Sequence, residues 1–129
     1  MGIDPGTNIM GFGVIKIIDS KITLLNSGVL NMKKEKDLGV RLKLIFEEMI
    51  QLIDTYLPDE LAIEAQFFGQ NVQSMLKLGK AQGVAIAAAL SRSIPFEEYA
   101  PKKIKMSITG KGNSSKEQVA AMLIHILKV

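Results

Sequence analysis

The sequence predicts an α/β protein built on a mixed five-stranded sheet with helices on both faces. Three β-rich segments come first, and the second and third have the pattern of a hairpin. After them, segments with helical periodicity alternate with short apolar strands. Hairpin strands pair antiparallel, whereas strands joined through helices pair parallel, so a single sheet would contain both kinds of pairing.

The expected strands differ in length. The first is short, because only three residues precede Asp4, whereas a typical strand has about five residues. The hairpin strands are expected at residues 11–19 and 22–30, joined by a polar turn at Asp19-Ser20-Lys21. The two later strands are expected at residues 60–64 and 94–99.

Four segments have the pattern of helices. In the first, apolar side chains recur on one stripe, Asp37 is the expected N-cap and Pro58 marks the stop. The last is expected to be capped by Ser114 or Ser115. The expected helices span residues 37–56, 71–92, 102–108 and 115–128.

Size and composition favour a single soluble domain that spans residues 1–129. Hydrophobic residues make up 47% of the chain and charged residues 22%, and 129 residues suit one core. The chain has no cysteine, which excludes disulfides and cysteine metal sites. No basic-then-apolar leader opens the chain, and no apolar run is long enough to cross a bilayer. We therefore expect a cytoplasmic protein.

Basic residues gather at the C-terminal end of the chain. Residues 1–100 carry a net charge of −2, whereas residues 101–129 carry +5, with lysines opposed by Glu117 alone. A local excess of lysine is typical of a face that contacts nucleic-acid phosphates. A solvated surface has the same composition, so charge alone leaves both interpretations open.

Two carboxylates end apolar strands and are the candidate metal ligands. Asp4 follows Gly2-Ile3 and precedes a Pro-Gly turn, and Glu64 follows Leu61-Ala62-Ile63. Sites in α/β folds commonly lie at strand ends, and converging carboxylates bind Mg²⁺, which takes oxygen ligands. In two-metal nucleases such carboxylates hold ions about 3.5–4 Å apart. The residues alone leave other interpretations open, with Asp4 bonding amides of its turn and Glu64 as an exposed strand-end residue.

A series of motifs runs through the chain. They are Gly2-Ile3-Asp4-Pro5-Gly6-Thr7, Gly11-Phe12-Gly13-Val14, Ala62-Ile63-Glu64, Leu76-Lys77-Leu78-Gly79-Lys80-Ala81-Gln82-Gly83, Glu98-Tyr99-Ala100-Pro101-Lys102-Lys103-Ile104-Lys105 and Gly110-Lys111-Gly112. In this order and spacing they resemble the RuvC family of Holliday junction resolvases. The resemblance implies a ribonuclease-H-like fold and a homodimer. It also implies Mg²⁺-dependent paired nicking of a four-way DNA junction, with a branch-migration helicase complex as partner.

The resemblance assigns catalytic roles by position. Asp4 and Glu64 match the first two of the family's four acidic residues, which together hold two Mg²⁺ ions. The family places the other two on a further C-terminal helix, in an Asp-x-x-Asp pattern. This chain ends at Val129 and has no Asp or Glu after Glu117. We therefore expect a fragment, shortened at both ends, that cleaves poorly or not at all.

The resemblance also implies DNA contacts. Phe67 matches a residue that acts at the junction centre, and an apolar ring in a loop can unstack a base. From the residues alone, a core position remains open for Phe67 and for the neighbouring Phe68. Lys105 and Lys116 match basic residues beside the scissile DNA. Lys111, in the same basic segment, is a further expected DNA contact.

Two other functions stand as alternatives. An ATP-binding half-domain of the actin, sugar-kinase and heat-shock ATPase type has a similar first phosphate loop, but it needs an Asp-Gly-Gly loop that this sequence lacks. A non-cleaving junction-binding module would match a chain without the last acidic residues. Among the remaining features, His125 is expected at the surface. Gly79, Gly83 and Ala87 form a small-residue ridge that can pack on the sheet or on a partner chain.

Overall fold

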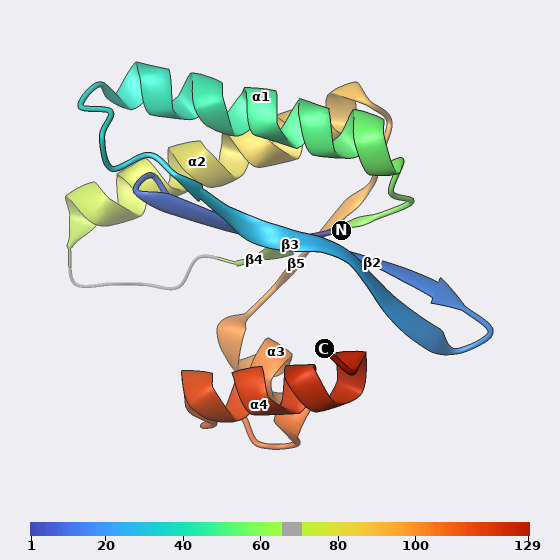
Figure 1. Ribbon diagram of the computed structural model, residues 1–129. Coiled ribbons are helices and arrows are strands. Elements are labelled where there is room, and N and C mark those ends of the chain that lie inside the picture. Colours follow the sequence, from blue (N-terminus) through green and yellow to red (C-terminus); the bar gives the residue numbers. More distant parts are fainter. Residues whose placement is uncertain (66–70) are drawn as a thin grey trace.

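The computed structural model describes residues 1–65 and 71–129 and consists of a sheet with helices on both sides (Figure 1). The helices α1 (Leu38–Tyr56) and α2 (Val72–Ser91) lie above the sheet in Figure 1, and α3 (Pro101–Thr109) and α4 (Lys116–Leu127) lie below it. The predicted coverage of both faces is therefore confirmed. Within the described residues, no helix combines the length and apolarity needed to cross a membrane.

The sheet contains five strands in the order β3-β2-β1-β4-β5. The short central strand β1 pairs antiparallel with β2 and parallel with β4, so the two kinds of pairing meet at β1. The outer pairs continue this division, because β2–β3 is antiparallel and β4–β5 is parallel. The mixed five-stranded sheet is as predicted. The strands are β1 (Gly2–Asp4), β2 (Ile9–Ile18), β3 (Lys21–Asn31), β4 (Leu61–Glu64) and β5 (Phe96–Tyr99).

The hairpin turn is one residue shorter than the sequence indicated. Asp19 and Ser20 both have positive φ angles, 50° and 66°, as in the two-residue turns that match the twist of paired strands. Ile18 pairs with Lys21, so Lys21 begins β3 and is not part of the turn. The expected turn contained Asp19 and Ser20 but also Lys21, and the left-handed backbone of the first two residues sets the register of the hairpin.

Local capping chemistry sets the helix boundaries. Asp37 caps α1, because its side chain accepts a hydrogen bond from a first-turn amide at 3.1 Å. The helix ends where Leu57 adopts a left-handed backbone, one residue before Pro58. Ser115 caps α4 in a capping box with Gln118, which decides between the two serines considered from the sequence.

The hydrophobic core lies between the sheet and the α1–α2 layer. Alanines of α2 fill the space beside α1, and their small side chains allow the helices to pack closely. On the opposite side, α3 and α4, both fully described, contribute no buried residue. The buried cluster consists of Ile3, Met10, Met32, Ile45, Met49, Ile53, Leu61, Ile63, Ala81, Ala85, Ala88, Ala89 and Ile94.

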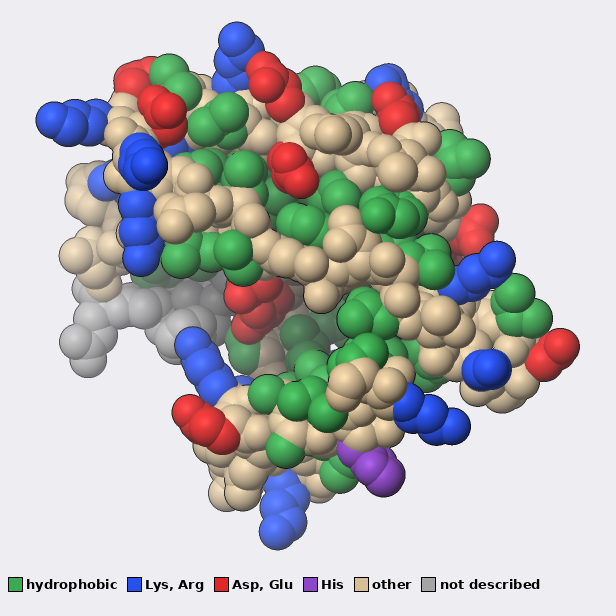
Figure 2. All heavy atoms as spheres, in the orientation of Figure 1, with side chains coloured by type: hydrophobic (Ala, Val, Ile, Leu, Met, Phe, Trp, Pro, Cys, Tyr) green, Lys and Arg blue, Asp and Glu red, His purple; other side chains and the backbone are tan. Residues whose placement is uncertain are grey.

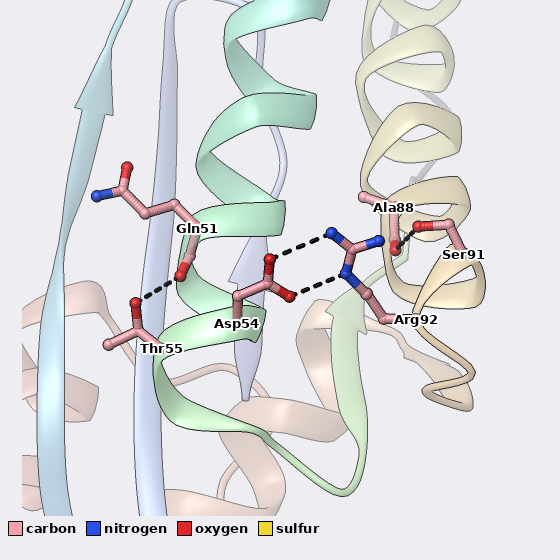
Figure 3. A network of polar contacts seen from close by, with 6 residues as sticks. All are labelled: Gln51, Asp54, Thr55, Ala88, Ser91 and Arg92. Carbon is pink, nitrogen blue, oxygen red and sulfur yellow. Dashed lines mark hydrogen bonds and ion pairs between the residues drawn. The ribbon is translucent and has the colours of Figure 1, made fainter.

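An exposed ion pair joins the C-terminal ends of α1 and α2 (Figure 3). Arg92 donates from Nε to Asp54 Oδ1 at 2.9 Å and from Nη2 to Asp54 Oδ2 at 3.1 Å. This two-pronged contact lowers the pKa of the Asp54 carboxyl, chiefly through the hydrogen bonds. Both side chains are solvated, so the pair orients the helix ends more than it stabilises the fold.

Candidate active site

Asp4 and Glu64 lie at the ends of the neighbouring parallel strands β1 and β4. Ile3 pairs with Ile63, so the two acidic residues occupy the next positions along these strands. Ile3 and Ile63 are buried in the core under α1 and α2. Because successive side chains of a strand point to opposite faces, the carboxylates point to the other face, where α3 and α4 lie.

The two carboxyl groups are close enough to interact strongly. Burial raises the pKa of Glu64 to about 7, and hydrogen bonding to Asp4 and its negative charge add to the rise. Lys105 and Lys116 both oppose this rise in the Glu64 pKa, so their ammonium groups lie within electrostatic reach. The fold thus brings together four residues that the sequence singled out, at the carboxyl ends of the inner strands β1 and β4: Asp4, Glu64, Lys105 and Lys116.

The strand ends around the carboxylates are built from small residues. Gly11 pairs with Asp4, and a Cβ at position 11 would lie 3.6 Å from the Asp4 Cβ, so a larger side chain would stand against the carboxylate. The turn after Asp4 is tighter still. A Cβ on Gly6 would lie 2.4 Å from the Ile9 carbonyl oxygen, which excludes any other residue without a backbone shift.

A hollow opens beneath the same face of the sheet. Its volume is about 500 Å³, and its lining is mostly apolar, from Gly13 and Ala62 of the sheet to Leu123 and Leu127 of α4. Figure 2 shows an opening between the upper layer and the lower helices, with acidic side chains visible in it and basic side chains at its left end. Neither Asp4 nor Glu64 lines this hollow, but Asp4 is exposed and Glu64 is half-buried.

The lysines stand on a compact helical pair. Lys105 is half-buried on α3, Lys116 is exposed in the first turn of α4, and Lys111 is exposed on the connecting turn. The Thr109 hydroxyl accepts from the Lys111 amide at 3.2 Å and is hydrogen-bonded to the buried Ser114 hydroxyl, which donates to the Lys111 carbonyl at 2.7 Å. These bonds hold α3, the connecting turn and α4 together, and this helical pair carries all three lysines.

The remaining sequence-based assignments have separate outcomes. Phe67 and Phe68 lie outside the described residues, so the roles predicted for them stay predictions. His125 is exposed on α4, as expected. Sequence reasoning assigned no role to two residues near the site. Gln82 is a buried α2 residue whose side-chain amide donates to the Glu64 carbonyl at 3.5 Å. Arg41 donates hydrogen bonds to Thr7 and Asn8 in the turn after Asp4. Both act over long sequence separations that no local pattern reveals.

The donor set fits a hard divalent cation. Carboxylate oxygens are the ligands that Mg²⁺ prefers, and because burial and the neighbouring Asp4 raise the pKa of Glu64, a bound cation would favour the ionised forms of both groups. Within residues 1–65 and 71–129, no group of three or more acidic, histidine or cysteine side chains gathers at one place. Asp4 and Glu64 thus form a two-carboxylate site.

Comparison with known proteins identifies the family. The profile described as "Crossover junction endodeoxyribonuclease RuvC" matches residues 1–129, the whole chain. The chain belongs to the RuvC family. Among its relatives, RuvC of Christiangramia forsetii is 66% identical over 95% of this chain and 64% of its own length. RuvC of Cytophaga hutchinsonii is 61% identical over 98% of this chain and 64% of its own length.

Solved RuvC structures share the fold. Thermus thermophilus RuvC superimposes with a TM-score of 0.88 at 30% identity, over 99% of this chain and 79% of that chain. Its complex with a Holliday junction substrate gives a TM-score of 0.91, also at 30% identity, over 99% and 78% of the two chains. The ribonuclease-H-like fold expected from the sequence is therefore confirmed, and the ATP-binding half-domain is not favoured. The chain spans about two thirds of the length of the RuvC relatives named above.

Proposed function

We propose that this chain is the junction-binding and metal-binding part of a structure-selective DNA endonuclease that resolves Holliday junctions. The proximity of Asp4 and Glu64 beside Lys105 and Lys116 carries the proposal. Paired carboxylates suit a divalent cation, and adjacent lysines suit the phosphates on either side of a scissile bond. The Thermus thermophilus relative with the same fold was solved with a Holliday junction substrate.

Within this site the residues have separate tasks. Asp4 and Glu64 would hold Mg²⁺, which supplies positive charge to the oxygens of a phosphodiester during hydrolysis. Lys105 and Lys116 bind backbone phosphates and offset part of the negative charge of the carboxylates. Phe67 is proposed to act on bases at the junction centre, because its sequence position matches the residue with that role in the family.

A non-cleaving binding module is the second candidate for the 129-residue chain taken alone. Two carboxylates contribute a charge of −2, which is little for two divalent cations, and Mg²⁺ loses its waters reluctantly. A displaced ion costs about 100-fold or more in rate. We therefore expect this chain to bind four-way junctions weakly and to cleave them negligibly.

The decisive experiment compares this chain with a version extended to the length of its relatives, in a junction cleavage assay with Mg²⁺. The extended protein should cleave, and its Asp4→Asn and Glu64→Gln variants should lose at least about 100-fold in rate while junction binding changes little. Cleavage by either variant at the unsubstituted rate would refute the assignment of that carboxylate. Cleavage by the 129-residue chain at the rate of the extended protein would refute the second candidate.

We further propose that the protein acts as a homodimer through α2. This helix exposes an apolar stripe, Val72, Leu76, Gly83 and Leu90, on the side away from the core. Light scattering should give twice the chain mass, and Gly83→Glu should give a monomer with an unchanged circular dichroism spectrum. The family resemblance also supports a cytoplasmic location and cooperation with a branch-migration helicase complex.

A further inference from the structure

The turn between β1 and β2 carries the chain away from Asp4 and is held from outside the sheet. Its residues, 5–8, belong to neither strand. The Asn8 carbonyl accepts a hydrogen bond from the Met32 amide at 2.8 Å. The other contacts come from one side chain, because Arg41 Nη1 donates to the Thr7 carbonyl at 3.2 Å and to Asn8 Oδ1 at 2.6 Å. Arg41 therefore provides most of the polar anchoring of this turn.

Arg41 joins three segments that are far apart in sequence. It stands in the first turn of α1, it binds the 5–8 turn, and its Nε donates to the Glu35 carbonyl at 2.6 Å in the loop before the helix. A guanidinium group can do this because its donors are fixed in one plane and point in several directions. A lysine at position 41 would keep the charge, but its single ammonium group could not satisfy acceptors on both sides at once.

Movement of this turn reaches Asp4 directly. The turn follows Asp4 without a break, and its backbone is closely folded, because a Cβ on Gly6 would lie 2.4 Å from the Ile9 carbonyl oxygen. Asp4 is the last residue of β1, and it pairs with Gly11 of β2 but has no partner in the described strand β4, so the turn that follows bears on its position. An error of about 1 Å at a reacting group can cost on the order of 100-fold in rate.

We propose that Arg41 is a positioning residue of the active site, which fixes the turn after Asp4 and thereby the placement of the Asp4 carboxylate against Glu64. The inference rests on the proposed function, in which these carboxylates hold Mg²⁺. It adds a residue that acts on Asp4 through the backbone of residues 5–8.

Arg92 provides a matched control. It also extends from a helix and donates two hydrogen bonds from its guanidinium, but to Asp54 at the other end of α1 (Figure 3). Asp54 follows Arg41 by 13 positions on α1, which corresponds to roughly 20 Å along the helix. Arg41→Lys and Arg92→Lys therefore make the same chemical change, at opposite ends of the same layer.

The experiment is NMR spectroscopy of the 129-residue chain, first without metal and then during a Mg²⁺ titration. Without metal, Arg41→Lys should lower the backbone order parameters of Thr7 and Asn8 from about 0.85 toward 0.6 and shift the carboxyl carbon of Asp4. In the titration it should weaken Mg²⁺ binding at Asp4 and Glu64 by about tenfold. Arg92→Lys should leave all of these signals unchanged.

Two results would overturn the inference. One is a normal Asp4 carboxyl signal and normal Mg²⁺ affinity in Arg41→Lys. The other is an equal loss of affinity in Arg92→Lys, which would indicate general destabilisation. If the unsubstituted chain gave no Mg²⁺ response at Asp4 and Glu64, these two carboxylates alone would not bind the ion, and cleavage by the extended protein would test the proposed function separately. The carboxyl carbon signal of Asp4 without metal would then decide the inference. A shift of this signal in Arg41→Lys but not in Arg92→Lys would support it, and no shift in Arg41→Lys would refute it.

Discussion

Replacing Glu64 by glutamine should stabilise the protein, and only at neutral and alkaline pH. The folded chain raises the pKa of Glu64 from its ordinary value of 4.5 to about 7, mainly through burial and then through Asp4. Between these values the folded state binds more protons than the unfolded state, so stability falls as pH rises. Above about pH 7 the full cost of ionising Glu64 is present, and below 4.5 it is absent.

The size of the effect follows from the same two pKa values. Each pH unit corresponds to about 1.36 kcal/mol, which gives a ceiling of roughly 3.4 kcal/mol. Glu64 is half-buried, and solvent screening reduces the expected gain to about 1–2 kcal/mol. For a chain of this length, that gain raises the melting temperature by about 4–8 °C.

The assay is thermal unfolding followed by circular dichroism at pH 4 and pH 8, in the presence of EDTA. Glu64→Gln should melt higher than the unsubstituted chain at pH 8 and at the same temperature at pH 4. Glu98→Gln, which changes an exposed glutamate on the adjacent strand β5, should have no such pH-dependent effect. An equal gain at both pH values, or a loss at pH 8, would refute the electrostatic reasoning. Adding Mg²⁺ at pH 8 should narrow the difference, because the cation stabilises only the chain that retains both carboxylates.

Three further predictions test other parts of the structure. Lys105→Ala and Lys116→Ala should each reduce the slope of log binding constant against log salt concentration by about 0.9 in junction binding. Lys128→Ala, at the far end of α4, should leave this slope unchanged, and unchanged slopes for the first two variants would exclude phosphate contact. Gly6→Ala should destabilise the fold by about 1–3 kcal/mol in urea unfolding, because the new Cβ would meet a backbone oxygen; wild-type stability would show that the turn can relax. Met49→Ala, at a fully buried core position, should cost about 2–5 kcal/mol, and a loss below about 1 kcal/mol would mean that α1 packs less tightly on the sheet than described.

Local chemistry explains which features were predictable from the sequence. Asp37 and Pro58 bracket α1 because capping and proline geometry involve only neighbouring residues. Asp4 and Glu64 were recognisable as a pair because each ends an apolar strand, and parallel strands bring their carboxyl ends to one edge.

Features that depend on long-range contacts were not predictable in this way. The bonds from Arg41 to Thr7 and Asn8 join residues more than thirty positions apart. Gln82 is one of several polar residues in α2, and the sequence does not distinguish it from the exposed ones. The fold buries it and brings its side chain to the Glu64 carbonyl. The length of the hairpin turn was missed for a local reason, since Asp and Ser occur in turns of several lengths.

The division of the sheet at β1 also separates local strand pairing from long-range strand pairing. The hairpin of β2 and β3 closes through a two-residue turn, and such hairpins form in about 1–10 μs. Pairing of β1 with β4 must instead close a loop that contains the hairpin and all of α1. Closing this longer loop costs more chain entropy than closing the hairpin. Asp4 and Glu64 lie on these two strands, sixty positions apart. The carboxylate pair therefore exists only in chains that have completed this long-range pairing, and a chain in which β1 and β4 are unpaired contains both residues without containing the site.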